Sequence, residues 1–128
     1  MTNLIKVLLP VLFLEIIATG AKAQGKNVET TEFEVKGVCG MCKNRIENAS
    51  LIKGVKFSEY DVETHVLRVV YRSDKTDVND IHKSVAKSGH TTNKVEADPK
   101  AYAKLPACCL YADPDNPHLQ DPHKGHNH

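Results

Sequence analysis

The sequence predicts an α+β fold in which strands and helices follow in the order strand, helix, strand, strand, helix, strand. Three observations support this order. Short stretches with apolar residues at alternate positions indicate strands. Two longer stretches repeat apolar residues every three to four positions, as amphipathic helices do. Glycines and polar residues separate these stretches and indicate turns.

The first half of the fold begins with residues 31–35, which alternate in polarity and predict a strand with Phe33 and Val35 on one face. Residues 41–51 carry apolar side chains at helical spacing and predict the first helix. We expect Gly54 to end this helix, because glycine readily adopts the left-handed conformation found at helix C-termini.

The second half contains two strands, a helix and a last strand. Residues 55–61 alternate again, and the β-branched residues 66–71 follow a polar turn, so the two stretches predict a hairpin. Asp77 is a good N-cap for a second helix that ends at Gly89. Residues 91–95 predict a short last strand. The order is that of a ferredoxin-like sandwich, with two helices on one face of a four-stranded antiparallel sheet.

The N-terminus, residues 1–23, has the features of a secretory signal peptide. A basic residue precedes the apolar stretch 7–17, and small residues at Ala21 and Ala23 suit cleavage after Ala23. The apolar stretch is too short for a transmembrane helix and contains an acidic residue. We therefore expect an exported protein, in the bacterial periplasm, with no membrane anchor after cleavage.

The charge balance of the remaining chain excludes some classes of function. Residues 24–128 hold 15 basic and 15 acidic residues once Lys6, Lys22 and Glu15 are removed from the totals of 17 and 16. No basic surface for nucleic acid is expected from such a balance. The sequence shows no pair of a nucleophile and a base and no phosphate-binding loop, so we expect a binding protein and not an enzyme. We also expect the protein to be a monomer.

The four cysteines form two close pairs. Cys39 and Cys42 are three positions apart, and Cys108 and Cys109 are adjacent. Cysteines of exported proteins usually form disulfides, but neither pair closes a loop long enough to restrict the unfolded chain much. Cross-pairing between the two pairs stays open at this point.

The pair Cys39 and Cys42 suits a soft metal ion. The N-terminus of the first helix favours thiolates, and two thiolates with no other ligand suit Cu(I) or Hg(II). Zinc normally takes four ligands. Two alternatives remain: a thiol–disulfide exchange protein that uses the same pair, and an adaptor domain that binds no metal tightly.

Residues 33–95 resemble the heavy-metal-associated domain, the module of copper chaperones, metal-pumping ATPases and periplasmic mercury-binding proteins. The resemblance is carried by the pair Cys39 and Cys42 between the first strand and helix, by Gly54-Val55, by the hairpin, and by the second helix up to Gly89. We assign the domain to residues 31–97, after a lead-in at 24–30. The resemblance implies capture of a metal ion that is passed to, or withheld from, a membrane metal transporter or efflux component.

The sequence departs from the family pattern in the metal loop. The family usually has a methionine two positions before the first cysteine, packed under the loop, whereas this chain has Gly37-Val38 before Cys39 and carries Met41 between the cysteines. His90 occupies the loop before the last strand. We consider it either a third ligand or a solvent-exposed loop residue.

Residues 98–112 form a separate segment, in which Asp98-Pro99 predicts the start of a short helix. Cys108 and Cys109 follow it. They would form a second soft-metal site, join the first pair around one ion, or serve as structural residues. Four thiolates around one ion would also admit Zn(II) or Cd(II).

Residues 113–128 combine closely spaced prolines with several histidines and predict a disordered tail. This tail either binds Cu(II), Ni(II) or Zn(II) weakly or is a solvated segment without a metal role. The tail histidines are His118, His123, His126 and His128. We expect two further histidines, His65 in the hairpin turn and His82 on the second helix, to be exposed to solvent, with His65 at the end of the sheet far from the metal loop.

Overall fold

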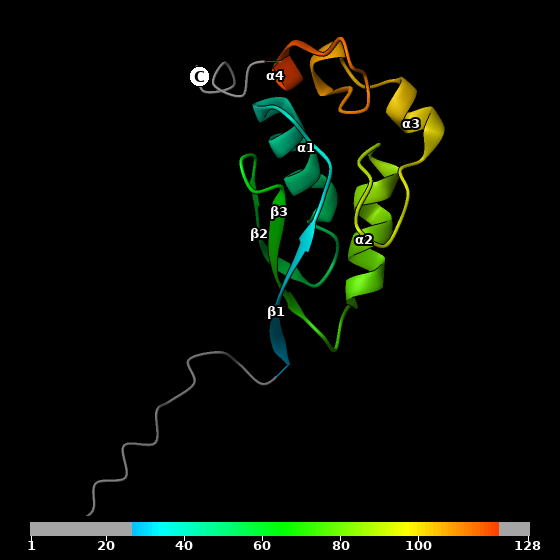
Figure 1. Cartoon of the computed structure of the whole chain (residues 1–128). Helices are drawn as coiled ribbons and strands as arrows, with labels where there is room; N and C mark the ends of the chain where they lie inside the picture. The colour runs from blue at the N-terminus through cyan, green and yellow to red at the C-terminus, as the bar shows by residue number, and fades with distance from the viewer. Residues whose placement is uncertain (1–26, 121–128) are drawn as a thin grey trace, which may run out of the picture.

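The computed structural model describes residues 27–120, so the expected signal peptide and the first residues of the lead-in lie outside the described part (Figure 1). Among the described residues, no helix has both the length and the apolar character needed to span a bilayer. The first five elements are β1 (Val28–Glu34), α1 (Gly40–Ser50), β2 (Val55–Asp61), β3 (Val66–Arg72) and α2 (Val78–Lys87). They occur in the predicted order.

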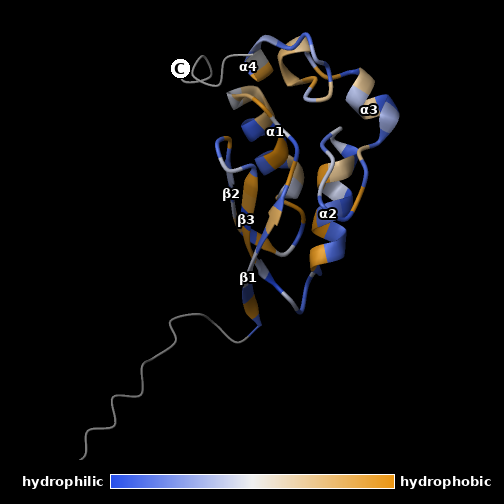
Figure 2. Cartoon of the chain, in the orientation of Figure 1, coloured by the Kyte–Doolittle hydropathy of each residue, from blue (hydrophilic) through white to orange (hydrophobic). Residues whose placement is uncertain are grey.

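The sheet is antiparallel, with β3 between β1 and β2. Along β3 the buried residues Leu67, Val69 and Tyr71 alternate with residues that are more exposed, such as Arg68. This alternation means that one face of the sheet is covered and the other faces solvent. Figure 2 shows apolar residues along the strands and on parts of both long helices.

The two long helices cover that face. Ile46 of α1 and Ile81 and Val85 of α2 are fully buried in the same cluster as the inward residues of the sheet. Asp77 caps α2 as predicted, since its carboxylate accepts a hydrogen bond of 2.9 Å from the Asp80 amide. The core therefore lies between one sheet face and the helix pair.

The predicted last strand is reduced to one bridge. Val35 pairs with Thr92, and two hydrogen bonds flank this bridge, from the Lys36 amide to the Thr91 carbonyl at 2.8 Å and from the Asn93 amide to the Glu34 carbonyl at 3.1 Å. The Thr92 hydroxyl then accepts hydrogen bonds from the amides of residues 94 and 95 and turns the chain away. The described sheet has three strands, and the predicted fourth strand is not confirmed as a regular strand.

Two details near β2 differ from the prediction. Helix α1 ends at Ser50, so Gly54, with φ of 97°, does not cap it but lies in the turn into β2. A register irregularity between Val55 and Phe57 then changes which residues of β2 point inward, and Phe57 is 44% exposed. The alternation predicted for residues 55–61 would place Val55 and Phe57 on the same face of the strand.

The C-terminal segment is folded. It contains α3 (Pro99–Ala103), a 3₁₀ turn η1 (Ala107–Cys109) and the one-turn helix α4 (Pro117–Gln120). Asp98 caps α3 with hydrogen bonds of 2.9 and 3.0 Å to the next amides, as the sequence predicted. Figure 1 shows η1 and α4 above the N-terminal end of α1.

The expectation of a disordered tail from residue 113 onward is wrong for residues 113–120. Residues 113–120 form a turn and α4, because the side chain of Asn116 is 2% exposed and hydrogen-bonds to the η1 region. His118 lies in α4. The remaining tail histidines, His123, His126 and His128, lie outside the described residues.

Candidate metal centre

The loop between β1 and α1 places Cys39 and Cys42 against each other. Cys39 is the N-cap of α1, and its Sγ accepts a hydrogen bond of 3.4 Å from the Cys42 amide. The two Sγ atoms lie 3.1 Å apart, and both residues are buried. A cysteine at the N-cap takes the place of the usual serine or aspartate, which brings its sulfur to the positive end of the helix.

Tyr60 of β2 supports the loop from below. Its hydroxyl donates a hydrogen bond of 2.8 Å to the Val35 carbonyl and lies 3.4 Å from the Gly37 carbonyl. Met41, by contrast, is 51% exposed, so it does not pack under the loop as the family methionine does. Sequence reasoning missed Tyr60, because its inward position depends on the register irregularity in β2.

The second cysteine pair joins the first. η1 brings Cys109 Sγ to 3.4 Å from Cys39 Sγ, and Cys108 Sγ lies 3.9 Å from Cys109 Sγ. The sulfurs of Cys39, Cys108 and Cys109 all lie within 4.8 Å of one another. All four cysteines are free thiols, so the cross-pairing left open by the sequence is not present as a disulfide.

The electrostatics of the cluster favour one thiolate before any metal binds. Hydrogen bonding by the Cys42 side chain lowers the pKa of Cys39 to about 5, and the same interaction raises the pKa of Cys42. Burial raises the pKa of Cys109 to about 11. The lowered pKa favours the thiolate of Cys39 at neutral pH, while the raised pKa values of Cys42 and Cys109 favour their protonated forms until a metal replaces the protons.

Of the two basic residues of α1, Arg45 contacts the cluster. Its Nη1 atom lies 3.5 Å from Cys109 Sγ. Lys43 instead forms an ion pair with Glu47 and donates to the Tyr60 carbonyl at 2.7 Å. Arg45 is thus the cation positioned to compensate negative charge on the sulfurs.

His90 is fully buried, so the expectation of a solvent-exposed loop residue is wrong. Its Nδ1 lies 2.7 Å from the Lys36 carbonyl, whereas Nε2 has no partner and is the one such buried side-chain nitrogen or oxygen in the described range. Burial lowers the pKa of His90. His90 is not part of the three-sulfur group, which contains cysteines alone.

The other described histidines lie outside the sulfur group. His82 is 1% exposed, contrary to expectation, because its ring stacks on Phe33 at 3.8 Å between centroids. His65 is exposed as expected, but it lies at the metal-loop end of the sheet, where its carbonyl accepts a hydrogen bond of 2.9 Å from the Val35 amide. His118 is partly exposed on α4.

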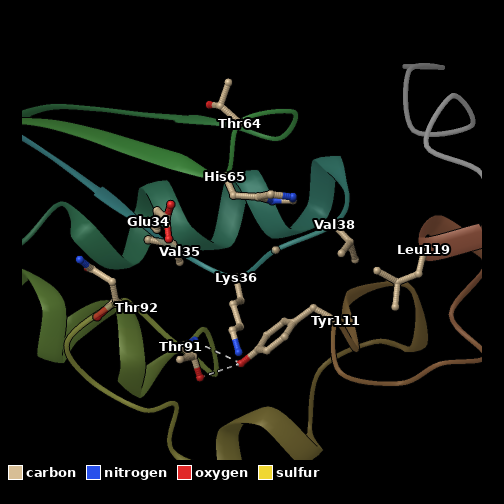
Figure 3. A pocket seen from close by; sticks show the side chains of 12 residues that line it. Glu34, Val35, Lys36, Val38, Thr64, His65, Thr91, Thr92, Tyr111 and Leu119 are labelled. Carbon is tan, nitrogen blue, oxygen red and sulfur yellow. Dashed lines mark hydrogen bonds between the residues drawn. The ribbon is translucent and has the colours of Figure 1, made fainter.

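A pocket of about 350 Å³ lies beside the metal loop. Figure 3 shows Lys36, Val38, His65 and Tyr111 around it, with the Tyr111 hydroxyl directed at Thr91. No cysteine lines this pocket. It is therefore distinct from the sulfur cluster.

One family model and several solved structures match this chain. The model of the heavy-metal-associated domain matches residues 32–91. The crystal structure of oxidized MerP from Ralstonia metallidurans CH34 matches with 26% identity and a TM-score of 0.49, over 52% of this chain and 94% of that chain. No curated protein matches the sequence.

Two further solved structures are similar to this chain. The Cu(I)-loaded N-terminal domain of a potential copper-translocating P-type ATPase from Bacillus subtilis matches with 30% identity and a TM-score of 0.48, over 51% of this chain and 84% of that chain. A CopZ metallochaperone matches with 26% identity and a TM-score of 0.48, over 50% of this chain and 98% of that chain.

Proposed function

Because the chain belongs to the heavy-metal-associated domain family, we propose that it captures a soft metal ion through the thiolates of Cys39 and Cys42. The ion is Cu(I) or Hg(II), since these soft ions prefer thiolates and accept low coordination numbers. The chain then passes the ion to a partner or withholds it from one.

The observation that carries the proposal is the pair of sulfurs at the N-terminus of α1. Cys39 Sγ and Cys42 Sγ lie 3.1 Å apart, and the pKa of Cys39 is lowered to about 5 by hydrogen bonding from Cys42. A thiolate is the form that binds metal, so the first ligand is ready at neutral pH. Metal binding then displaces the proton of Cys42.

Transfer of the metal ion to a partner is consistent with binding by two thiolates. A soft ion with few protein ligands accepts an additional thiolate from a partner before it leaves the first protein. We infer that the partner is a membrane metal transporter or an efflux component. The signal-like residues 1–23 support a periplasmic location for this exchange.

The test is a titration of the reduced protein with Cu(I) against a competing Cu(I) chelator, repeated with Hg(II). Tight binding of one equivalent is expected, with loss of that binding in Cys39→Ser and in Cys42→Ser. Retention of one tight equivalent by both variants would place the site elsewhere. Asn48→Ala, an exposed substitution on the same helix, is the matched control.

The same titration distinguishes the proposed metal binding from the alternative function, thiol–disulfide exchange. A thiol–disulfide exchange protein would bind neither ion tightly, yet would reduce a disulfide substrate such as insulin through Cys39 and Cys42. Absence of tight metal binding together with reductase activity would therefore replace the metal proposal with the exchange function.

A further inference from the structure

The C-terminal segment is attached to the domain by contacts that involve no sulfur. The hydroxyl of Tyr111 donates 2.8 Å to the Gly89 carbonyl and accepts 3.1 Å from the Thr91 amide. Leu105 is buried in the common core. The segment is therefore held against the metal-loop end of the fold whether or not the cysteines interact.

The shape of the turn that carries the second cysteine pair is fixed from within. The side-chain amide of Asn116 donates to the carbonyls of Ala107, Cys108 and Leu110 at 3.4, 3.2 and 3.0 Å. Asn116 is 2% exposed, so these hydrogen bonds are shielded from water. These hydrogen bonds thus fix the position of Cys109 in the fold.

The sulfur separations fit an ion with more than two thiolates. With metal–sulfur bonds of about 2.3 Å, two sulfurs lie about 4.6 Å apart in a linear site and about 3.8–4.0 Å apart in tetrahedral or trigonal sites. Cys39 Sγ is 3.1 Å from Cys42 Sγ and 3.4 Å from Cys109 Sγ, so both separations are closer to those of a trigonal or tetrahedral site than to that of a linear site. Binding of one ion by all three sulfurs needs these atoms to move apart by only about 0.4–0.9 Å.

We propose that Cys109 is a third thiolate ligand of the ion that Cys39 and Cys42 capture. The inference rests on the function proposed above and adds a ligand from outside residues 32–91, the part that matches the family model. The C-terminal segment thereby closes the site over a soft ion. The side chain of Cys109 is fully buried, so it approaches the site from the side that is shielded from solvent.

Charge supports this assignment. Three thiolates around Cu(I) carry a net charge of minus two, and around Hg(II) minus one. The guanidinium of Arg45 lies 3.5 Å from Cys109 Sγ and offsets part of that charge.

Cys108 has a different position. Its Sγ donates to the Met41 sulfur at 3.6 Å, and Met41 is 51% exposed. The outer thiol is thus paired with a surface thioether, while Cys109 faces the buried sulfurs. The adjacent residue therefore provides a matched control with the same chemistry and the same neighbours in sequence.

The experiment is X-ray absorption at the metal edge of the reduced protein loaded with one equivalent of Cu(I). Three sulfur neighbours are expected for the wild type and for Cys108→Ser, and two for Cys109→Ser. The Cu(I) affinity of Cys109→Ser should fall at least about tenfold. Removing even a residue that only hydrogen-bonds to a metal ligand lowers metal affinity by about that factor. Two sulfurs in the wild type, or three in Cys109→Ser, would overturn the inference.

A second measurement needs no variant and so does not depend on Cys109→Ser folding. The Cu(I)-loaded wild type is treated with iodoacetamide, and the modified thiols are located by mass spectrometry. Compared with the metal-free protein, Cys39, Cys42 and Cys109 should react more slowly once Cu(I) is bound, while Cys108 should react at an unchanged rate. Slower reaction of Cys39 and Cys42 without a change at Cys109 would refute the third ligand and leave the proposed function intact, whereas failure to bind either Cu(I) or Hg(II) would refute the function itself.

Discussion

The Tyr60 hydroxyl donates a 2.8 Å hydrogen bond to the Val35 carbonyl, directly before the loop that ends at Cys39. The tyrosine is 1% exposed and lies on a different strand from the loop it supports. Its burial raises its pKa, so the hydroxyl remains protonated and available as a donor. The shape of the metal loop therefore depends on a residue of β2.

Replacing Tyr60 with Phe should remove this support. The Val35 carbonyl would lose its hydroxyl donor inside the fold, and the expected cost is about 1–3 kcal/mol in the free energy of unfolding. Chemical denaturation of the reduced, metal-free protein measures it. Tyr71→Phe is the control, because the Tyr71 hydroxyl bonds to the exposed Glu29, and its loss should cost about 0.5 kcal/mol or less. Equal costs in both variants would show that Tyr60 is not a specific support.

Two glycines of the metal loop should respond oppositely to alanine. A Cβ at Gly37 would lie 3.0 Å from Ile46 Cδ1 and from the Tyr60 hydroxyl, and 3.1 Å from Cys42 Cβ, whereas a Cβ at Gly40 meets nothing within 4 Å. Gly37→Ala should destabilise the fold by about 1–3 kcal/mol and weaken Cu(I) binding, because the loop must move away from the core.

Gly40→Ala is the matched control for that substitution. Gly40 is the first residue of α1, where alanine is a better helix former, so its stability should change by less than about 1 kcal/mol and toward stabilisation. Thermal unfolding and Cu(I) competition of both variants provide the comparison. A tolerated Gly37→Ala would mean that the loop adapts without loss.

The free energy of unfolding should decrease as the pH falls, because the fold buries the side chain of His82. Burial lowers the pKa of His82 below the ordinary 6.5, with a smaller effect of Lys94. The unfolded chain therefore takes up a proton near pH 6.5, while the folded chain resists it until lower pH. The contribution of His82 is complete above 6.5 and is lost as the pH falls through its folded pKa.

The variant His82→Gln isolates this contribution. Glutamine cannot titrate and can still hydrogen-bond to the Thr92 hydroxyl, which lies 2.7 Å from His82 Nδ1. Urea midpoints on both sides of pH 6.5 should fall less steeply in the variant than in the wild type. Part of the slope should remain, because the pKa of His90 is lowered as well. An unchanged slope would exclude His82 as a source.

Sequence patterns predicted the elements well and the tertiary contacts less well. The periodicity of α2 and its cap at Asp77 are local signals, and both are confirmed. The fourth strand was predicted from propensity alone, and the Thr92 hydroxyl ended it after one bridge. The exposure of His82 was predicted wrongly, because stacking on Phe33 is a contact between distant residues.

The residues of the candidate site were likewise predictable only in part from the sequence. Cys39 and Cys42 are recognisable from spacing, since both lie at the start of one helix. The contact between Cys39 and Cys109 spans 70 positions and depends on how the C-terminal turn packs. No local pattern fixes such a contact, so the sequence left the role of Cys109 open.

The last prediction concerns the residue that shapes this turn. In Asn116→Ala, the carbonyls of Ala107, Cys108 and Leu110 lose their side-chain donor. Local opening should become easier by about 1–3 kcal/mol, so amide exchange at Cys109 and Tyr111 should accelerate roughly 10- to 100-fold. Hydrogen exchange measured by NMR, with the α2 amides as internal reference, gives these rates.

Asn48→Ala on the exposed face of α1 should leave the same amides unchanged. If exchange at Cys109 stays slow in Asn116→Ala, other contacts hold the turn, and Tyr111 is the next candidate because it bonds to Gly89 and Thr91. If exchange accelerates, Cu(I) affinity should fall together with it, because a mobile Cys109 must be ordered again each time an ion binds.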